Sequence, residues 1–414
     1  MANWWCANHL AAGRAMPETE ARSEPRQASR FLWLYALAIA GGAVSYVPFL
    51  TLLLPLRAQA LTGGEAIDLL GYVAFCGAIA ASLSNIAFGW ASDLTSTRRP
   101  WILAGLVISA SLLIFMRTVE TPLQLILLIV AWQLGLNMML GPLSAWAGDV
   151  VPDCQKGRLG GMLSLAPALG AASGALITIP GLADADTRLL LVAALVAAMV
   201  LPVLIFGRPD PMPHLMPASG AAQTDIFGPK RKAVVRMWLA RLLVQIAEAA
   251  LFAYLLIWLI GMEPTFTDND TARIFASVLV LSVPAAMLCG RWSDRNDRPL
   301  VPLAIGAAIG TAGLVVMALA PSLGFAITGY FVFGLSTSVF LALHSSQTLR
   351  VLPQPATRGR DLGIFNLTNT VPSLIMPWLT ITLVPLFGFN GLFAALSALA
   401  AVATVLLLTI ARAK

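Results

Sequence analysis

Long apolar stretches separated by short polar turns fill the chain from residue 31 to its C-terminal end. A helix that crosses a membrane needs about 20 mostly apolar residues, and twelve stretches meet this requirement. They cover residues 31–55, 67–91, 101–117, 122–149, 159–182, 187–206, 234–260, 271–292, 300–320, 322–350, 361–384 and 389–411. The pattern predicts an all-α membrane protein with twelve transmembrane helices.

Two polar segments divide this pattern. Residues 1–30 mix arginines, glutamates and two prolines and lack the apolar core of a signal peptide, so we interpret them as a flexible cytoplasmic tail. Residues 207–233 are rich in proline and contain a basic cluster, which is typical of a solvated linker. The prediction is therefore an N-terminal six-helix bundle, 31–206, and a C-terminal one, 234–414.

A repeated charged turn relates the two bundles. It runs from Gly89 to Trp101 in the first half and from Gly290 to Pro299 in the second, and its aspartates, Asp93 and Asp294, are 201 residues apart. A second landmark, a proline before a Gly-Arg pair, recurs at the same offset. The two halves are thus expected to be pseudo-symmetric, with a solute bound at their interface near the middle of the membrane, one of the known plans of secondary transporters.

Composition supports the membrane assignment and gives an orientation. Hydrophobic residues make up 58% and charged residues 11% of the chain, against roughly 25% charged residues in soluble domains. Positive residues accumulate in cytoplasmic loops, and placing the N-terminus inside assigns 21 of 26 lysines and arginines to the cytoplasm. We expect an inner-membrane protein with both termini in the cytoplasm, and attribute the net charge of +6 to loops rather than to nucleic-acid binding.

Several functional classes lack support in the sequence. The four cysteines show no pairing or metal-ligand spacing, and the three histidines belong to no cluster. We find no nucleophile–base constellation and no phosphate-binding loop. We therefore expect no metal, no cofactor and no enzymatic activity, and a chain that acts as a monomer.

The repeated turn resembles the signature loop of the major facilitator superfamily, in which glycine, three residues, aspartate and basic residues connect spans two and three. The matching residues are Gly89, Asp93, Arg98 and Arg99 in the first half and Gly290, Asp294, Arg295 and Arg298 in the second. Three short loops, at 98–101, 152–158 and 359–366, are more particularly similar to the sucrose-type and glycoside cation symporters. The resemblance implies a carrier that works by alternating access. The sodium-coupled sugar carriers of this family tend to bury acids in spans two and four. Here these spans have acids only at their ends, so we expect protons rather than sodium as the coupling ion.

The charged turns are candidates for a cytoplasmic gate formed by Asp93, Arg98, Arg99, Asp294, Arg295 and Arg298. A carboxylate at the end of a helix can pair with arginine and accept hydrogen bonds from backbone N–H groups at a neighbouring helix start. If these partners separate when the inner side opens, the turns stabilise the outward-facing state. The alternative is a solvated loop that only sets topology, because exposed ion pairs contribute at most about 1 kcal/mol.

Span seven carries charged residues within the predicted hydrocarbon region. Arg241, Gln245 and Glu248 share one helical face, and Glu248 lies about 21 Å along the span at 1.5 Å per residue. An ionised carboxylate at this depth costs several kcal/mol, which favours its protonated form. We predict that Glu248, with Arg241, couples transport to protons; a structural ion-pair network and direct solute binding are the alternatives.

Uncharged polar residues in the spans are candidates for binding a hydroxylated solute. They are Gln133, Asn137 and Trp132 in span four, Gln245 in span seven, and Asn366 and Asn369 in span eleven. Amides donate and accept hydrogen bonds with hydroxyl groups, and aromatic faces suit sugar C–H surfaces. Small polar residues also join helices at roughly 0.6 kcal/mol each, which is the alternative role.

These observations together favour proton-coupled uptake of a sugar or glycoside. Proton-antiport efflux of amphipathic compounds is the nearest alternative. A membrane receptor or assembly factor without transport activity is a further one.

Overall fold

The computed structural model describes residues 26–62, 67–179, 181–215, 229–266, 268–352 and 355–411. Most of the predicted tail, 1–25, and the middle of the predicted linker, 216–228, lie outside the described residues.

Every apolar stretch of the N-terminal half folds as helix close to its predicted limits. The helices are α1 Ser29–Pro48, α2 Leu54–Thr62, α3 Ile67–Leu94, α4 Arg99–Phe115, α5 Pro122–Val150, α6 Asp153–Leu163, α7 Leu165–Ile177 and α8 Ala185–Phe206. The first span joins α1 to α2 through a π-helical turn, Phe49–Leu53, that directly follows Pro48. A proline within a span lacks the N–H that the regular helix needs, and the local pattern of hydrogen bonds changes there.

The described part of the C-terminal half has five α-helices: α9 Pro229–Met262, α10 Asp268–Asn296, α11 Val301–Ala318, α12 Leu323–Val351 and α13 Arg358–Ala411. α9 begins at Pro229, so the last residues of the predicted linker belong to the seventh span.

α13 contains two spans. Its 54 residues would form a helix of about 81 Å at 1.5 Å per residue, far longer than the hydrocarbon core of about 30 Å. Gly388 interrupts it with φ 66° and ψ −175°, a conformation that glycine adopts readily. In the described part of the chain eleven helices are long and apolar enough to cross a membrane, and the break in α13 makes twelve spans. The predicted all-helical membrane fold is confirmed.

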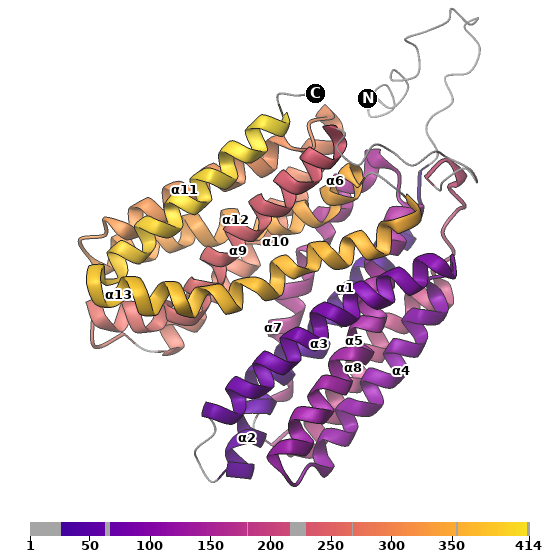
Figure 1. Cartoon of the computed structure of the whole chain (residues 1–414), viewed down its shortest axis with the longest axis horizontal. Helices are drawn as coiled ribbons and strands as arrows, with labels where there is room; N and C mark the ends of the chain where they lie inside the picture. The colour runs from indigo at the N-terminus through magenta and orange to yellow at the C-terminus, as the bar shows by residue number, and fades with distance from the viewer. Residues whose placement is uncertain are drawn as a thin grey trace, which may run out of the picture.

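The two halves form separate bundles that meet at the end of the molecule carrying α6 and diverge toward the end carrying α2 (Figure 1). Each bundle has its own apolar core, which includes Trp132 and Tyr35 in the first half and Phe340 and Phe393 in the second. Between the bundles, α3 packs against α13, and α6 packs against α10 and α12. These two seams carry the groups described next.

Candidate functional site

The first seam between the halves is closed by Asp93 at the end of α3. Its two carboxylate oxygens accept hydrogen bonds from the backbone N–H groups of Gly359 (3.0 Å) and Arg360 (2.9 Å) in the first turn of α13. These N–H groups have no partner within the helix, and the helix dipole is positive there. Arg98 completes the cluster at 2.7 Å from the same carboxylate, with both side chains buried.

The second seam repeats this arrangement with the roles of the halves exchanged. Asp294 at the end of α10 accepts from the backbone N–H groups of Gly157 (2.8 Å) and Arg158 (2.6 Å) in α6. Its ion-pair partner is Arg350 of α12, at 2.9 Å. Both repeated aspartates therefore bind backbone N–H groups of a helix that belongs to the other half, in the first turn of α13 for Asp93 and in the second turn of α6 for Asp294. We call these two clusters the gate.

Glycine pairs allow the backbones to approach at both seams. A Cβ atom on Gly89 or Gly359 would collide with the carbonyl oxygen of the other residue, and the same holds for Gly157 and Gly290. The carboxylates reach the opposing N–H groups only because no side chain separates these helices.

Asp149 adds a charge pair that crosses the first seam. It is buried near the end of α5 and accepts from Arg98 Nε (2.8 Å) within its own half and from Arg358 Nη1 (2.7 Å) of the other half. Sequence analysis did not assign Asp149, Arg350 or Arg358 to the gate. One signal was present: Asp149 and Arg350 are separated by 201 residues, the same offset as the two gate aspartates.

Three of the arginines proposed for the gate lie elsewhere. Arg99 Nη2 donates to the carbonyl oxygens of Leu204 and Gly207 at the end of α8, inside its own half. Arg295 and Arg298 have exposed side chains, and Arg350 supplies the cation that pairs with Asp294. Arg295 lies in the last turn of α10, and Arg298 lies in the turn that follows, where Asp297 takes a positive φ of 47°.

A second polar cluster lies within the C-terminal half and centres on Arg241 of α9. Its guanidinium donates to Gln245 Oε1 (3.3 Å), to Ser345 Oγ of α12 (2.9 Å) and to Asn369 Oδ1 of α13 (3.3 Å). Asn369 in turn donates to Asn366 Oδ1 at 2.6 Å. Arg241 and Gln245 are half-buried and Asn369 is exposed, so donors and acceptors from three helices remain accessible. The structure thus brings three of the predicted binding residues, Gln245, Asn366 and Asn369, together with Arg241, which was predicted to take part in proton coupling.

Glu248 lies two turns beyond Arg241 on the same helix and close to the middle of the span Lys232–Met262. The Gln245 side chain accepts a hydrogen bond from Arg241 at 3.3 Å, and Gln245 stands between the two charged residues along the helix. The carboxylate also interacts electrostatically with Tyr330 of α12 and with Tyr46 of α1 in the other half. Glu248 itself is half-buried.

Gln133 and Asn137 belong to a third network, between α3 and α5. Asn85 Nδ2 donates to Asn137 Oδ1 at 2.9 Å, and Asn137 Nδ2 donates to the backbone and side-chain oxygens of Gln133 at 2.9 and 3.3 Å. Gly363 of α13 packs against the backbone of Asn85. This places the network within about one helical turn of Asn366, because three residues of helix rise about 4.5 Å.

Trp132 does not join any of these groups. Its side chain has 0% exposure and packs edge-on against Phe49, with 5.0 Å between ring centroids. Its indole Nε1 has no hydrogen-bond partner in the structure. The neighbouring residue Gln133 points toward Gly77 of α3. Successive residues of a helix differ in direction by about 100°, so Trp132 points into the core instead.

The chain matches the profile of one known protein family over most of its length. The profile of the Major Facilitator Superfamily matches residues 32–354 and 237–414, which together span nearly the whole chain. The chain belongs to this superfamily. A comparison with curated protein sequences gave no significant match.

Solved structures of superfamily transporters share the fold at low sequence identity. The transporter FucP in its outward conformation aligns with a TM-score of 0.75 at 14% identity, covering 92% of this chain and 98% of that one; a second structure names it the fucose:proton symporter of Escherichia coli. The human organic anion transporter MFSD10 aligns with a TM-score of 0.72 at 15% identity, covering 91% and 99%. A bacterial homologue of the iron transporter ferroportin, in an outward-facing state, gives 0.71 at 14%, covering 92% and 98%.

As a superfamily member, the chain is a multi-pass membrane transporter of small-molecule solutes and not an enzyme. The geometry divides its polar groups by position. The gate groups lie at the end where the bundles meet, whereas Arg241, Glu248 and the amides lie deeper within the spans.

Proposed function

We propose that this transporter takes up a sugar or glycoside together with protons. The observation that carries the proposal is the accessible cluster of Arg241, Gln245, Asn366 and Asn369, with Glu248 on the same face of α9. Guanidinium and amide groups supply the mixture of donors and acceptors that several adjacent hydroxyl groups require. The loops that resemble sucrose-type and glycoside symporters support the same substrate class.

Glu248 is the proposed coupling acid. With Glu248 ionised, the cluster holds one carboxylate and one guanidinium, with Gln245 between them along the helix. Protonation removes the negative charge from this pair and frees Gln245 and Arg241 to bind solute more strongly. Because Glu248 also interacts electrostatically with Tyr46 of the other half, movement of the halves changes its surroundings and can drive proton release.

The proposed topology places both termini and the gate in the cytoplasm of an inner-membrane protein, as the distribution of positive residues favours. With this orientation, the closed seams at the gate correspond to a conformation that faces outward.

Glu248→Gln tests the coupling proposal in proteoliposomes. We expect the variant to lose proton-driven accumulation of a labelled disaccharide while exchange between the two sides continues, because Gln keeps the shape and hydrogen bonds but not the titration. Glu263→Gln, an exposed acid just beyond α9, is the matched control and should accumulate normally. Normal accumulation by Glu248→Gln would reject the coupling role. Absence of any saturable sugar exchange in the wild type would reject the substrate class, and proton-driven export of amphipathic compounds would favour antiport.

A second substrate class is favoured by one specific observation. The three hydrogen-bond partners of the Arg241 guanidinium, Gln245, Ser345 and Asn369, are all uncharged. A solute carboxylate could therefore form a bidentate pair with Arg241 once Glu248 is protonated. Inhibition of counterflow by small organic acids, rather than by disaccharides, would support an anionic solute, and Arg241→Gln should abolish it.

A further inference from the structure

The polar cluster around Arg241 comes from one half of the molecule. Its members are Arg241 and Gln245 of α9, Ser345 of α12, and Asn366 and Asn369 of α13, all in the C-terminal half. A ligand shifts an equilibrium between two conformations only by its difference in affinity for them. Because alternating access moves the halves relative to each other, the solute needs a contact with the N-terminal half as well.

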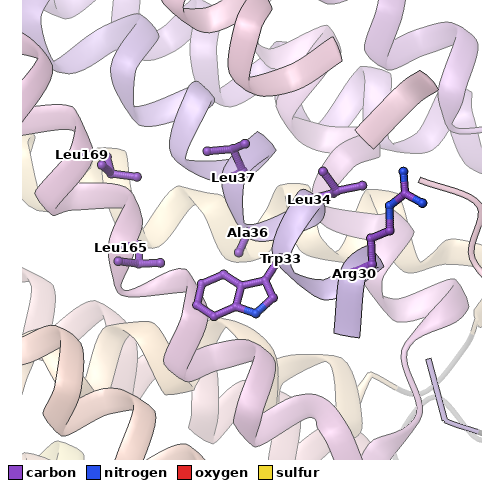
Figure 2. Close-up of a pocket in the computed structure, with 7 residues that line it drawn as sticks. All are labelled: Arg30, Trp33, Leu34, Ala36, Leu37, Leu165 and Leu169. Carbon is purple, nitrogen blue, oxygen red and sulfur yellow. The ribbon is translucent and has the colours of Figure 1, made fainter. Parts of the chain in front are cut away.

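A crevice between α1 and α7 does not provide this contact. Figure 2 shows that apolar side chains of the two helices line it together with Arg30. The Arg30 guanidinium lies over the Phe206 ring, 5.8 Å from the ring centroid. Leu165 and Leu169 on the opposite wall have no group that can bond a hydroxyl.

Ser82 of α3 and Thr370 of α13 join the two halves at a greater depth than the gate. Their hydroxyl oxygens are 2.8 Å apart, and both residues are half-buried. Ser82 lies eleven residues from Asp93, and Thr370 lies eleven residues from Gly359, so both helices place the pair about 16 Å from the first gate cluster. This is about half of a hydrocarbon core of about 30 Å. We call Ser82 and Thr370 the hydroxyl pair.

Thr370 connects the hydroxyl pair to the cluster around Arg241. It follows Asn366 by four residues, so the two side chains share one face of α13. Asn366 accepts a hydrogen bond from Asn369 at 2.6 Å, and Asn369 accepts one from Arg241 at 3.3 Å. Polar groups therefore continue from Arg241 to Ser82, which belongs to the N-terminal half.

The neighbouring hydrogen bonds set the direction of the bond within the pair. Ser82 donates its single hydroxyl proton to the carbonyl oxygen of Ala78 at 2.8 Å, so its oxygen accepts from the Thr370 hydroxyl. Thr370 has a second acceptor, the carbonyl oxygen of Leu367, at 3.4 Å. A solute hydroxyl can therefore take the place of Thr370 as the donor to Ser82.

The equivalent place in the second seam has no hydroxyl groups. Gly363 and Gly161 are equivalent in the two seams, because a Cβ on either would collide with the backbone of the opposing helix, at Ile86 and Met287 respectively. Counted from these contacts, the residues equivalent to the hydroxyl pair are Val283 and Ala168. Close packing of a seam at this depth does not require hydroxyl groups, which favours a role of the pair in binding.

We propose that Ser82 is a solute-binding residue of the N-terminal half, and that a solute hydroxyl replaces Thr370 as its hydrogen-bond donor. This inference rests on the proposed function, in which the solute carries hydroxyl groups. The incoming solute breaks a direct hydrogen bond between α3 and α13 and forms its own bond to Ser82. Occupation of the site thus changes a contact that holds the two halves together.

The directions of the effects of Ser82→Ala and Thr370→Ala on KM test the proposal. In counterflow of labelled sucrose in proteoliposomes, Ser82→Ala should raise KM about fivefold, the loss of one neutral hydrogen bond of about 1 kcal/mol. Thr370→Ala should lower KM, because the solute no longer has to displace the Thr370 hydroxyl. Thr409→Ala is the matched control: its exposed hydroxyl bonds its own helix at Leu406, and KM should stay within about twofold.

A hydroxyl pair that only joins two helices gives a different result. Both substitutions then remove the same hydrogen bond and shift KM in the same direction, which would overturn the proposal, as would the reverse order of the two effects. A conformational shift caused by loss of the pair is common to both variants, so the ratio of their KM values isolates the solute contact. Absence of saturable sucrose exchange in the wild type would reject the proposed substrate and the role of Ser82 together. Normal wild-type exchange with equal KM shifts in both variants would reject the role of Ser82 alone.

Discussion

Replacing Gly157 by alanine is expected to open the gate at the seam between α6 and α10. The new Cβ atom would lie 2.5 Å from the Gly290 carbonyl oxygen and 2.5 Å from Asp294 Oδ1. Cβ contacts below about 3.0 Å are essentially absent from real structures. Because one obstacle is backbone, the two helices must separate by about 0.5 Å or more to relieve the overlap, and interiors this closely packed have little room to adjust.

The separation weakens the hydrogen bonds that Asp294 accepts from Gly157 (2.8 Å) and Arg158 (2.6 Å). Hydrogen bonds to charged groups contribute about 1.5–3 kcal/mol each, so the two together account for about 3–6 kcal/mol. Alanine is more favourable than glycine within a helix by about 1 kcal/mol, which opposes the effect. The remaining 2–5 kcal/mol corresponds to a shift of at least about 30-fold toward the open gate.

Distances between spin labels on the two halves measure this shift. Suitable positions, in a background without native cysteines, are the exposed residues Thr97, in the turn after α3, and Asn296, the last residue of α10. We expect one short distance in the wild type and a populated longer distance in Gly157→Ala. Gly71→Ala is the control, because a Cβ there meets no atom within 4 Å. If Gly157→Ala gave the same distance distribution as the wild type and Gly71→Ala, the reasoning would be refuted.

Two further predictions concern buried groups. Asp149→Asn removes the carboxylate that joins Arg98 and Arg358 and should lower unfolding stability by about 3–5 kcal/mol, the usual effect of breaking a buried ion pair. Asp186→Asn, at an exposed position in the first turn of α8, should change it by less than about 1 kcal/mol. Thermal unfolding in detergent compares them, and equal effects would contradict the buried role of Asp149. Trp132→Phe should leave the KM for solute within about twofold, because the ring packs in the core and a side chain that does not touch solute contributes no binding energy; a tenfold rise in KM would show that the ring contacts solute.

The sequence predicted the fold because the spacing of apolar stretches and the 201-residue offset are properties of the linear chain. The helix limits follow within a few residues, and Gly388 marks the turn between the last two predicted spans. The same offset also led to Asp93 and Asp294, which the structure places against backbone N–H groups of helices of the opposite half.

The directions of side chains and their tertiary partners were harder to predict from the sequence. Trp132 and Gln133 are neighbours in sequence, yet the Trp132 side chain is buried in the core and the Gln133 side chain lies against Gly77 of α3. Which arginine completes each gate cluster depends on how α5, α12 and α13 pack, so proximity in sequence pointed to Arg295 whereas the fold supplies Arg350. Likewise, the approach of Glu248 to Tyr46 exists only once two distant spans adjoin.

The duplicated halves carry opposite charges at one equivalent position, Asp149 and Arg350, and this has a mechanical consequence. On the α3–α13 side a buried ion pair, Asp149 with Arg358, spans the two halves at 2.7 Å. On the α6–α10 side the pair of Arg350 with Asp294 belongs to one half, and Lys156 of the other half experiences repulsion from Arg350. The two edges are therefore unequal: a buried ion pair joins the halves at the first edge, whereas hydrogen bonds that involve backbone groups join them at the second. We expect the second edge to separate first when the gate opens.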